Sequence, residues 1–433
     1  MSSRFATYAQ TQDYLFSLKA RGVKFGIDRM RAFSAALGNP ERQVPVIHIA
    51  GTNGKGSTGA MMDAILHAAG KRTGLYTSPH LVRLGERVQV DRRALSEAEI
   101  MAYVEELGPK AAELGRDDPD DAPSFFEFMT AMAFLQFARK GCDVAIVEVG
   151  LGGRLDATNV VEPEVAVITS IALDHCEMLG FTHEAIAAEK AGVIKPGRPL
   201  VIGRLPPGAE AVIRARASEL GCPVTSVRDV FGEDVDGYPT SNLEGDYQRW
   251  NAATATLVAR ALPAAWGVTE AHIAEGLRRA DWPGRWQHLQ VGGRDLVLDS
   301  SHNPEGAEVL DENLRRLAKQ TGKKPVMIVG VLGAARAQPL LSTVARHAAE
   351  IHLVVPAQAR ACSHEELVAL IPPTFAGSVH RATVAGLFPA AGQCGAGGPD
   401  DVIVVTGSIY LVGEVMARLQ PERGPGEGRL QDF

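Results

Sequence analysis

A glycine-rich segment with one lysine followed closely by two hydroxyl residues carries the clearest chemical meaning in the sequence. It reads GTNGKGST from residue 51, between a β-branched run at Val44–Ala50 and a helical pattern at Ser57–Ala69. Glycines let backbone N–H groups turn inward around phosphate oxygens, and the start of the following helix presents its positive dipole end to the same anion. Lys55 can reach the terminal phosphates of a nucleotide, and Ser57 or Thr58 can place a hydroxyl near a metal ion. The segment therefore predicts a phosphate-binding loop.

The spacing of this loop is a variant of a common nucleotide-binding pattern, G-x-x-x-x-G-K-[ST]. Two fewer residues precede the Gly–Lys pair here, and Gly56 separates the lysine from the hydroxyl. A glycine-rich turn with an exposed lysine is the alternative interpretation, but the flanking strand and helix favour phosphate binding. The sequence has no N-K-x-D tetrapeptide for reading a guanine base, so we do not expect a GTPase.

A nucleotide-hydrolysing or nucleotide-transferring site also needs ligands for Mg²⁺, and two stretches offer candidates. Glu148 comes near the end of the apolar run Val144–Val149, where it is either a metal ligand or an ordinary surface acid. One or two carboxylates suffice, because Mg²⁺ keeps several of its waters. Asp174 and His175 follow a later strand-like run. Taken alone, His175 is more often a hydrogen-bonded loop residue, and Lys190 more often a helix-end lysine that offsets the helix dipole.

Short β-branched runs alternate with amphipathic stretches along the chain, which indicates an α/β fold with parallel sheets covered on both faces. The predicted strands are Val44–Ala50, Thr73–Tyr76, Val144–Val149, Val165–Thr169, Leu200–Ile202, Leu296–Asp299, Val326–Val331, Ile351–Val355 and Val402–Thr406. The predicted helices are Ser57–Ala69, Phe126–Ala138, Thr182–Ala191, Glu305–Lys319 and Ser363–Leu370.

Proline and glycine positions suggest where the chain divides. The stretch Ala280–Arg294 contains one proline and three glycines and precedes a new strand–helix alternation, so we interpret it as a linker. This predicts a larger domain at residues 1–288 and a smaller one at residues 289–433. We also expect a surface loop at Pro389–Asp400 and a loose tail after Gln420.

Composition and charge exclude several classes of protein. The chain has 433 residues, of which 45% are hydrophobic and 22% charged, so a large packed core is possible. A net charge of −7 gives no sign of a nucleic-acid or acidic-membrane partner. There is no signal-peptide pattern and no run of 18 apolar residues, so we expect a cytoplasmic protein without a membrane span. Single, unpaired cysteines fit a reducing compartment; they are Cys142, Cys176, Cys222, Cys362 and Cys394.

Several further motifs occur in one order with the phosphate loop. They are YTSPHL at residues 76–81, VEVGLGGRLDATN at 147–159, LDH at 173–175, EKAG at 189–192, HNP at 302–304 and TGSIYLVGE at 406–414. Together with GTNGKGS, they closely resemble the folylpolyglutamate synthase/dihydrofolate synthase family of the Mur-ligase-like superfamily, from about Gly26 to Glu414. The resemblance implies a P-loop NTPase-like N-terminal domain with a parallel-rich sheet and a smaller Rossmann-like C-terminal domain.

The resemblance also implies roles for individual residues. The positions matching the family's ATP site are Gly54, Lys55, Gly56, Ser57, Asn251, Arg285 and Asp299. For two Mg²⁺ ions, the matching ligands are Ser78, Glu148, His175 and Lys190, the last as a carbamate. Those matching the pterin-binding region are Ser124, Phe125, Phe126, Glu127, Leu155, Asp156 and Ala157. His302 lies near the nucleotide in this pattern and, with Lys55, His175 and Lys190, completes the expected catalytic set. Carbamylation would turn a cation into an anionic oxygen ligand, which suits a two-metal site.

The implied reaction is ATP-dependent amide formation through an acyl phosphate. L-Glutamate would be joined to dihydropteroate and to reduced folates such as tetrahydrofolate, by an enzyme we expect to be a monomer. Alternatives are a folylpolyglutamate synthase only, a Mur-type peptidoglycan ligase, and a nucleotide-binding module that has lost catalysis. The short segment before the phosphate loop favours the folate branch over Mur-type ligases.

Two departures from the family pattern stand out. The family usually has an aspartate–lysine–aspartate triplet after the second-domain strand that corresponds to Val326–Val331, but here the sequence reads GVLGAARAQP, without a carboxylate. Two serines also stand between Asp299 and His302, in LDSSHNP. The first departure raises the question of how the C-terminal domain contributes to the site.

Overall fold

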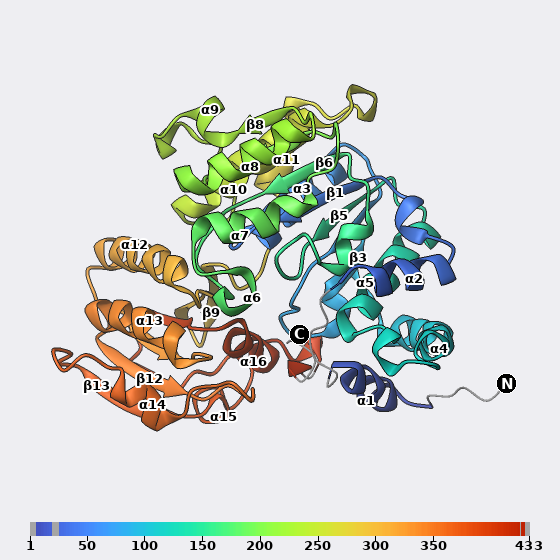
Figure 1. The fold of residues 1–433 in the computed structure, drawn as a ribbon. Helices are drawn as coiled ribbons and strands as arrows, with labels where there is room; N and C mark the ends of the chain where they lie inside the picture. The colour runs from blue at the N-terminus through green and yellow to red at the C-terminus, as the bar shows by residue number, and fades with distance from the viewer. Residues whose placement is uncertain (1–5, 20–25, 425, 429–433) are drawn as a thin grey trace.

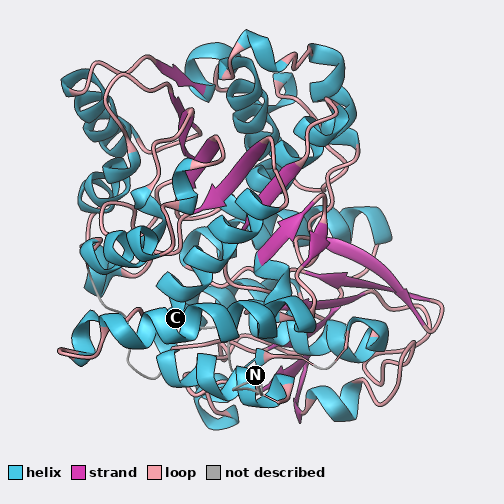
Figure 2. Cartoon of the chain, turned by 90° about the vertical axis from the view of Figure 1, so that its right-hand side faces the viewer, coloured by secondary structure: helices cyan, strands magenta, loops and turns pink. Residues whose placement is uncertain are grey.

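The computed structural model describes residues 6–19, 26–424 and 426–428, and their strands form two separate sheets. Figure 1 shows the N-terminal part in the upper and right-hand regions and the C-terminal part at the lower left. Helices surround both groups of strands (Figure 2). The predicted α/β class with two parallel-rich sheets is confirmed.

The larger sheet has eight strands in the order β4-β3-β2-β5-β1-β6-β7-β8, and only β3 runs opposite to the others, being antiparallel to its neighbours β2 and β4. Its central strands are buried along their whole length, as parallel strands covered on both faces must be. Their bounds are β1 Val46–Ala50, β2 Thr73–Tyr76, β3 Val88–Val90, β4 Arg93–Ala94, β5 Val144–Glu148, β6 Val165–Ile168, β7 Leu200–Ile202 and β8 Val224–Ser226.

Helices cover the two faces of this sheet unequally. One face packs against α3 (Lys55–Ala68), α9 (Val227–Phe231), α10 (Asp246–Ala261) and α11 (Glu270–Arg278). The other face carries two groups, α1 (Tyr8–Lys19), α2 (Asp28–Ala36), α4 (Glu97–Leu114) and α5 (Phe125–Arg139), and then α7 (His183–Lys190) and α8 (Pro207–Glu219). The short helix α6 (Cys176–Leu179) lies between β6 and α7.

The smaller sheet has six strands in the order β13-β12-β11-β14-β10-β9, with only β9 antiparallel. Their bounds are β9 Gln287–Val291, β10 Arg294–Leu298, β11 Val326–Val329, β12 Glu350–Val354, β13 Ser378–Ala382 and β14 Ile403–Thr406. On one face lie α12 (Pro304–Thr321), α13 (Ala334–His347) and α14 (His364–Ala369). On the other lie α15 (Val384–Leu387) and α16 (Ile409–Leu419).

Single turns of 3₁₀ helix connect many of these elements. They are η1 Pro40–Arg42, η2 Leu84–Arg87, η3 Pro119–Asp121, η4 Ala157–Val160, η5 Ala191–Val193, η6 Val235–Gly237, η7 Ala264–Trp266 and η8 Pro421–Arg423. Within the described part of the chain, no helix is long and apolar enough to cross a membrane.

Two predictions from the sequence are wrong in part. Residues 287–291 of the predicted linker form β9, because Gly292 and Gly293 make the two-residue turn of a hairpin with β10. The proposed boundary between residues 288 and 289 therefore falls inside a strand of the smaller sheet. The tail after Gln420 is not uniformly loose, since the side chain of Glu427 is buried and hydrogen-bonded. Residues 425 and 429–433 of that tail lie outside the described residues.

Candidate active site

The phosphate loop joins β1 to α3 and is held against its neighbours by close backbone approach. Gly51 and Gly54 adopt positive φ values of 150° and 83°. A Cβ on Gly51 would lie 1.9 Å from the Thr169 hydroxyl, and one on Gly54 would lie 2.3 Å from the side-chain oxygen of Asn251. Glycine is therefore required at both positions, and the loop is fixed in a shape that directs its following helix toward the cavity.

Two lysines meet at one backbone oxygen of this loop. The Nζ atom of Lys55 lies 3.0 Å from the carbonyl oxygen of Gly51, and the Nζ atom of Lys190 lies 2.9 Å from the same oxygen. Burial and the neighbouring Lys55 ammonium lower the pKa of Lys190 to about 7. The lysine that ends α7 is thus not a solvated surface residue but part of the loop's surroundings.

Two oxygen-bearing side chains face these cations from adjacent strands. Glu148, at the end of β5, is 3.9 Å from Lys55 Nζ, and burial raises the pKa of its carboxyl to about 7 despite this lysine. The hydroxyl of Ser78, which follows β2, is buried and has no hydrogen-bond partner. A buried hydroxyl without a partner is costly unless a ligand satisfies it. Both groups are hard oxygen donors of the kind that Mg²⁺ accepts.

A metal ion in this cavity would need ligands other than carboxylates and imidazoles. In the described ranges, no three or more His, Cys, Asp or Glu side chains are grouped closely enough to hold an ion by themselves. A site made from Ser78, Glu148 and phosphate oxygens does not require such a group. His175 is the left-handed residue that precedes α6, and burial lowers its pKa to about 4, which leaves a neutral imidazole. A neutral imidazole is the form that binds metals.

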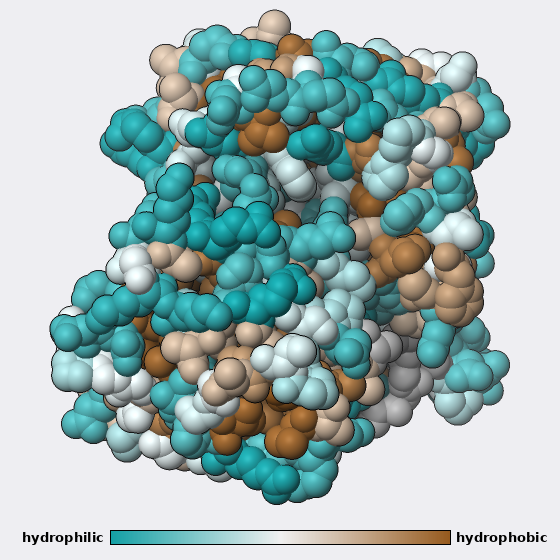
Figure 3. Space-filling model, turned by 90° about the vertical axis from the view of Figure 1, so that its left-hand side faces the viewer, coloured by the Kyte–Doolittle hydropathy of each residue, from teal (hydrophilic) through white to brown (hydrophobic). Residues whose placement is uncertain are grey.

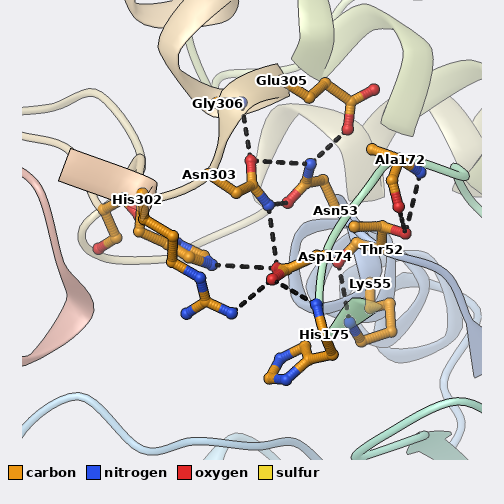
Figure 4. A network of polar contacts seen from close by, with 12 residues as sticks. Thr52, Asn53, Lys55, Ala172, Asp174, His175, His302, Asn303, Glu305 and Gly306 are labelled. Atoms are coloured by element: carbon orange, nitrogen blue, oxygen red, sulfur yellow. Dashed lines mark hydrogen bonds and ion pairs between the residues drawn. The ribbon is translucent and has the colours of Figure 1, made fainter. Parts of the chain in front are cut away.

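Residues at the start of α12, which packs on the smaller sheet, close the cavity on the side opposite the phosphate loop (Figure 4). Asn303, which precedes α12, donates to the Asn53 side-chain oxygen at 3.0 Å and to Asp174 at 3.2 Å. Asn53 in turn donates to Glu305, and the Asn303 side chain also caps α12 by accepting from Gly306. The phosphate loop and α12 are therefore joined by an amide–carboxylate network.

His302 belongs to the same network. Its Nδ1 atom lies 2.9 Å from the Ser300 carbonyl oxygen and therefore carries the proton, and its Nε2 atom is 3.8 Å from Asp174. The carboxylate of Asp299 accepts from the backbone N–H groups of Trp286 and Ser301 at 3.1 and 3.0 Å. Ser300 donates to Gly284. The two serines that depart from the family pattern thus hold the turn after β10.

All the residues predicted for the nucleotide and the metal ions line one cavity. They are Gly54, Lys55, Gly56, Ser57, Ser78, Glu148, His175, Lys190, Asn251, Arg285, Asp299 and His302. Seen from the face in Figure 3, the molecule is hollowed between its upper and lower parts, with mostly hydrophilic side chains around the hollow. Arg204, Tyr247 and Trp250 also line the cavity and were not predicted; the Arg204 guanidinium lies 4.9 Å from the Trp250 ring centre. No motif marks them, because their proximity depends on how α10, which carries Tyr247 and Trp250, packs near the loop after β7 that carries Arg204.

A second cavity adjoins the first. All seven residues predicted for the pterin region line it, and they are Ser124, Phe125, Phe126, Glu127, Leu155, Asp156 and Ala157. Leu151, Gly152 and Leu179 line both cavities, so the two spaces meet at these residues. Ser124 and Glu127 also form the capping box of α5, so part of their role is to start this helix.

Asp156 is a well-held carboxylate at the edge of this second cavity. It accepts from the Leu151 N–H at 2.9 Å, from the Thr158 N–H at 2.9 Å and from the Thr158 hydroxyl at 2.5 Å. Thr158 is itself 2.8 Å from the buried His48 ring. Burial raises the pKa of Asp156, although these donors lower it in part. The two phenylalanines and the fixed carboxylate can bind a flat heterocycle with N–H donors.

Comparisons with known proteins agree with this geometry. Residues 49–202 match the Mur ligase middle domain, and residues 284–409 match the Mur ligase glutamate ligase domain. A folylpolyglutamate synthase of Lacticaseibacillus casei is 34% identical, over 95% of this chain and 98% of that protein. A dihydrofolate synthase/folylpolyglutamate synthase of Escherichia coli is 32% identical, over 96% of each. The chain belongs to the folylpolyglutamate synthase/dihydrofolate synthase family.

A solved structure from this family extends the comparison to three dimensions. It is a bifunctional folylpolyglutamate synthase/dihydrofolate synthase with Mn, AMPPNP and L-glutamate bound. The two chains superpose with a TM-score of 0.79 at 33% identity, over 95% of this chain and 98% of that one.

The departure after β11 has a structural counterpart in this member of the family. Arg336, in the first turn of α13, donates to Asp174 at 2.5 Å, and the Asp174 side chain is only 9% exposed. Burial alone would raise the pKa of Asp174, but His175, His302 and Arg336 together lower it to about 2. The segment without carboxylates therefore contributes a cation that pairs with an aspartate of the larger domain.

We predict that Arg336→Ala lowers the free energy of unfolding by about 1–3 kcal/mol, because it removes one partner of a largely buried ion pair. Chemical denaturation followed by fluorescence would measure the change. Arg315→Ala is a matched control: its guanidinium is exposed and pairs with Asp311 within α12, so its loss should cost less than about 0.5 kcal/mol. Equal stability of the two variants would contradict the account.

Proposed function

We propose that the protein is an ATP- and Mg²⁺-dependent ligase that joins L-glutamate to folate-type carboxylates. The observation that carries the proposal is the meeting of the two cavities at Leu151, Gly152 and Leu179, between a phosphate loop and an aromatic pocket with a fixed carboxylate. A long substrate can place a heterocycle beside Phe125 and Asp156 while its carboxylate reaches the nucleotide. The ligands of the bifunctional relative, AMPPNP, Mn and L-glutamate, support this assignment.

The proposed reaction has two steps. The substrate carboxylate attacks the γ-phosphorus of ATP, so a carboxylate–phosphorus bond forms and ADP leaves. The uncharged amine of L-glutamate then attacks the acyl carbon, the amide forms, and inorganic phosphate leaves with one carboxylate oxygen. Both reactants of the first step are anions, so charge neutralisation is the main requirement, and Lys55 with the start of α3 supplies part of it.

Ser78 and Glu148 would hold one Mg²⁺, and His175 with a carbamate on Lys190 would hold a second. When bound, these ions neutralise the phosphates and orient them for attack. Glu148 needs no unusual chemistry for this role, because a cation beside its carboxyl group favours the ionised form that burial disfavours. His302 and Asp299, together with Asn251 and Arg285, would bind the nucleotide where the two sheets face each other.

We propose that Lys190 is carbamylated. Its Nζ atom shares an acceptor with Lys55, and two cations at that separation would repel each other. Because the pKa of Lys190 is lowered to about 7, a substantial fraction of its amine is neutral and nucleophilic at neutral pH. Addition of CO₂ to this amine with loss of one proton gives an anionic carbamate. The product would offset the charge of Lys55 and supply metal-binding oxygens.

We further propose that the larger and the smaller domain move relative to each other, with the hinge just before β9, a little earlier than the boundary that the sequence suggested. Closure would exclude water, which would otherwise hydrolyse the acyl phosphate. We also propose a cytoplasmic monomer. Small-angle scattering with and without ATP would test the motion, and sedimentation would test the monomer.

The function can be tested by following ADP release with dihydropteroate and L-glutamate, together and each alone. The proposal requires release that depends on both substrates. A Mur-type ligase would remain inactive with both, and a module without catalysis would release no ADP under any of these conditions. Activity with tetrahydrofolate but not with dihydropteroate would restrict the enzyme to folylpolyglutamate synthesis.

We predict that Lys55→Ala lowers kcat by about 10²–10³ while the fold persists, because a charge directed at the transferring phosphoryl group is lost. Steady-state kinetics and circular dichroism would measure the two effects. Turnover close to that of the unmutated protein would show that the loop does not bind the reacting phosphates.

We predict that both the carbamate and the activity depend on pH. Below pH 7 the Lys190 amine is mostly protonated and cannot add CO₂, so CO₂-free incubation at low pH should remove the modification and the activity. Returning the protein to higher pH with ¹³C-labelled bicarbonate should restore both and give a carbamate signal in the ¹³C NMR spectrum. Lys190→Ala should give no signal and little activity. An active preparation that never shows the signal would refute the carbamate.

We predict that Asp156→Ala impairs the dihydropteroate reaction more than the extension of tetrahydrofolate. The smaller substrate draws a larger share of its binding energy from the pterin end, so loss of this carboxylate should affect it more. The ratio of kcat/KM for the two substrates, in variant and unmutated protein, measures the difference. Equal losses on both substrates would count against the assignment of Asp156 to pterin binding.

A further inference from the structure

The loop of residues 77–87, between β2 and β3, lines the first cavity and contacts the wall of the second. It is closed at its ends, because the Thr77 N–H donates to the Arg87 carbonyl at 3.0 Å. Ser78, next to this junction, lines the first cavity. The Arg87 guanidinium, fully buried, lies 5.3 Å from the ring centre of Phe125, which lines the second cavity. A shift of this loop would therefore move groups at both sites.

The middle of the loop packs into the smaller sheet's core. Leu81 and Val82 are buried in one apolar cluster with Leu411, Val412 and Val415 of α16. The loop's own backbone is organised by Glu86, whose carboxylate accepts from three successive N–H groups, those of Leu81, Val82 and Arg83. The loop is thus a rigid unit that belongs to the larger sheet by its ends and to the smaller one by its centre.

Residues 426–428, which follow α16, return to this loop, and Glu427 binds it at three points and α1 at a fourth. Figure 1 shows the red segment that follows α16 next to α1 and α16. The Glu427 carboxylate accepts from the Leu84 N–H at 2.8 Å and from the Tyr8 hydroxyl at 3.1 Å. The Glu427 N–H donates to the Val82 carbonyl at 2.8 Å, and the Glu427 carbonyl lies 3.2 Å from the His80 ring.

The direction of the bonds through His80 follows from the chemistry of arginine. Arg87 Nε donates to His80 Nδ1 at 3.1 Å, and a guanidinium can only donate. His80 therefore accepts at Nδ1 and, being neutral in its buried position, carries its proton at Nε2. That proton is donated to the Glu427 carbonyl. Hydrogen bonds thus run from Glu427 through His80 to Arg87, whose guanidinium contacts the Phe125 ring of the aromatic pocket.

We propose that Glu427 is a positioning residue of the active site: through residues 77–87 it fixes Ser78 at the nucleotide cavity and Arg87 against Phe125. The proposal rests on the function proposed above, because it takes the first cavity as a metal–nucleotide site and the second as a pteroate site. It gives the chain end a role in substrate binding, although Glu427 lines neither cavity.

The test compares Glu427→Ala, Glu427→Gln and Tyr8→Phe with the control Glu422→Ala. Glu422 is an exposed acid in η8, five positions earlier on the same tail, and changes the charge equally. Two dissociation constants are measured well below the unfolding midpoint. One is for Mn²⁺ in the presence of ADP, by electron paramagnetic resonance, and the other is for dihydropteroate, by calorimetry.

Glu427→Ala should weaken both about tenfold, as expected from the loss of hydrogen bonds to a charged acceptor. Glu427→Gln, which keeps an acceptor for Leu84, should stay close to the unmutated protein, and Tyr8→Phe should show a smaller loss of the same kind. If Glu427→Ala does not fold, Tyr8→Phe decides the question through the same two constants, and unchanged constants there would overturn the proposal.

A lower unfolding midpoint for Glu427→Ala with both constants equal to those of Glu422→Ala would also overturn it, since Glu427 would then be structural only. Failure of the proposed function would give a different pattern in the two dissociation constants. If the unmutated protein binds Mn²⁺ with ADP but not dihydropteroate, the proposed substrate is wrong, and the Mn²⁺ measurement still decides the role of Glu427.

Discussion

Two lysine ammonium groups that share one backbone acceptor are the constraint on which the site depends. Lys55 and Lys190 come from different helices and both lie about hydrogen-bond distance from the Gly51 carbonyl, 3.0 and 2.9 Å away. Such a concentration of positive charge in a buried place is unfavourable without an anion, and the lowered pKa of Lys190 reports that cost. The same part of the cavity is also lined by the glycine turn, the start of α3 and Glu148.

Residues of the smaller domain form part of the wall of this cavity. Asn303 and Glu305 reach the phosphate loop through Asn53, and Arg336 reaches Asp174. These contacts are polar and lie at the edge of the cavity, so the domain closure proposed above would exchange them for ligand contacts. The packing of the loop 77–87 against α16 is of another kind, because it is apolar and buried in the core of the smaller sheet.

The sequence predicts the fold class and the central strands well, because β-branched runs and glycine turns are local signals. The phosphate loop was predicted from its own residues, and most other cavity residues from the resemblance to a known family that the ordered motifs carry; the placement of these residues in two adjoining cavities agrees with that expectation. Contacts between distant segments could not be predicted. Nothing local marks Arg336 as the partner of Asp174 or Glu427 as a buried acceptor, and the hairpin turn before β10 resembles a linker because both favour glycine.

Transfer of oxygen-18 from the substrate carboxylate tests the central claim most directly, that the two cavities bring a carboxylate to the γ-phosphate of ATP. Dihydropteroate labelled in its carboxylate would be turned over with ATP and L-glutamate, and the released phosphate analysed by mass spectrometry. Attack on phosphorus followed by amide formation predicts one labelled oxygen in each phosphate. Phosphate without label, formed in step with the amide product, would contradict the account.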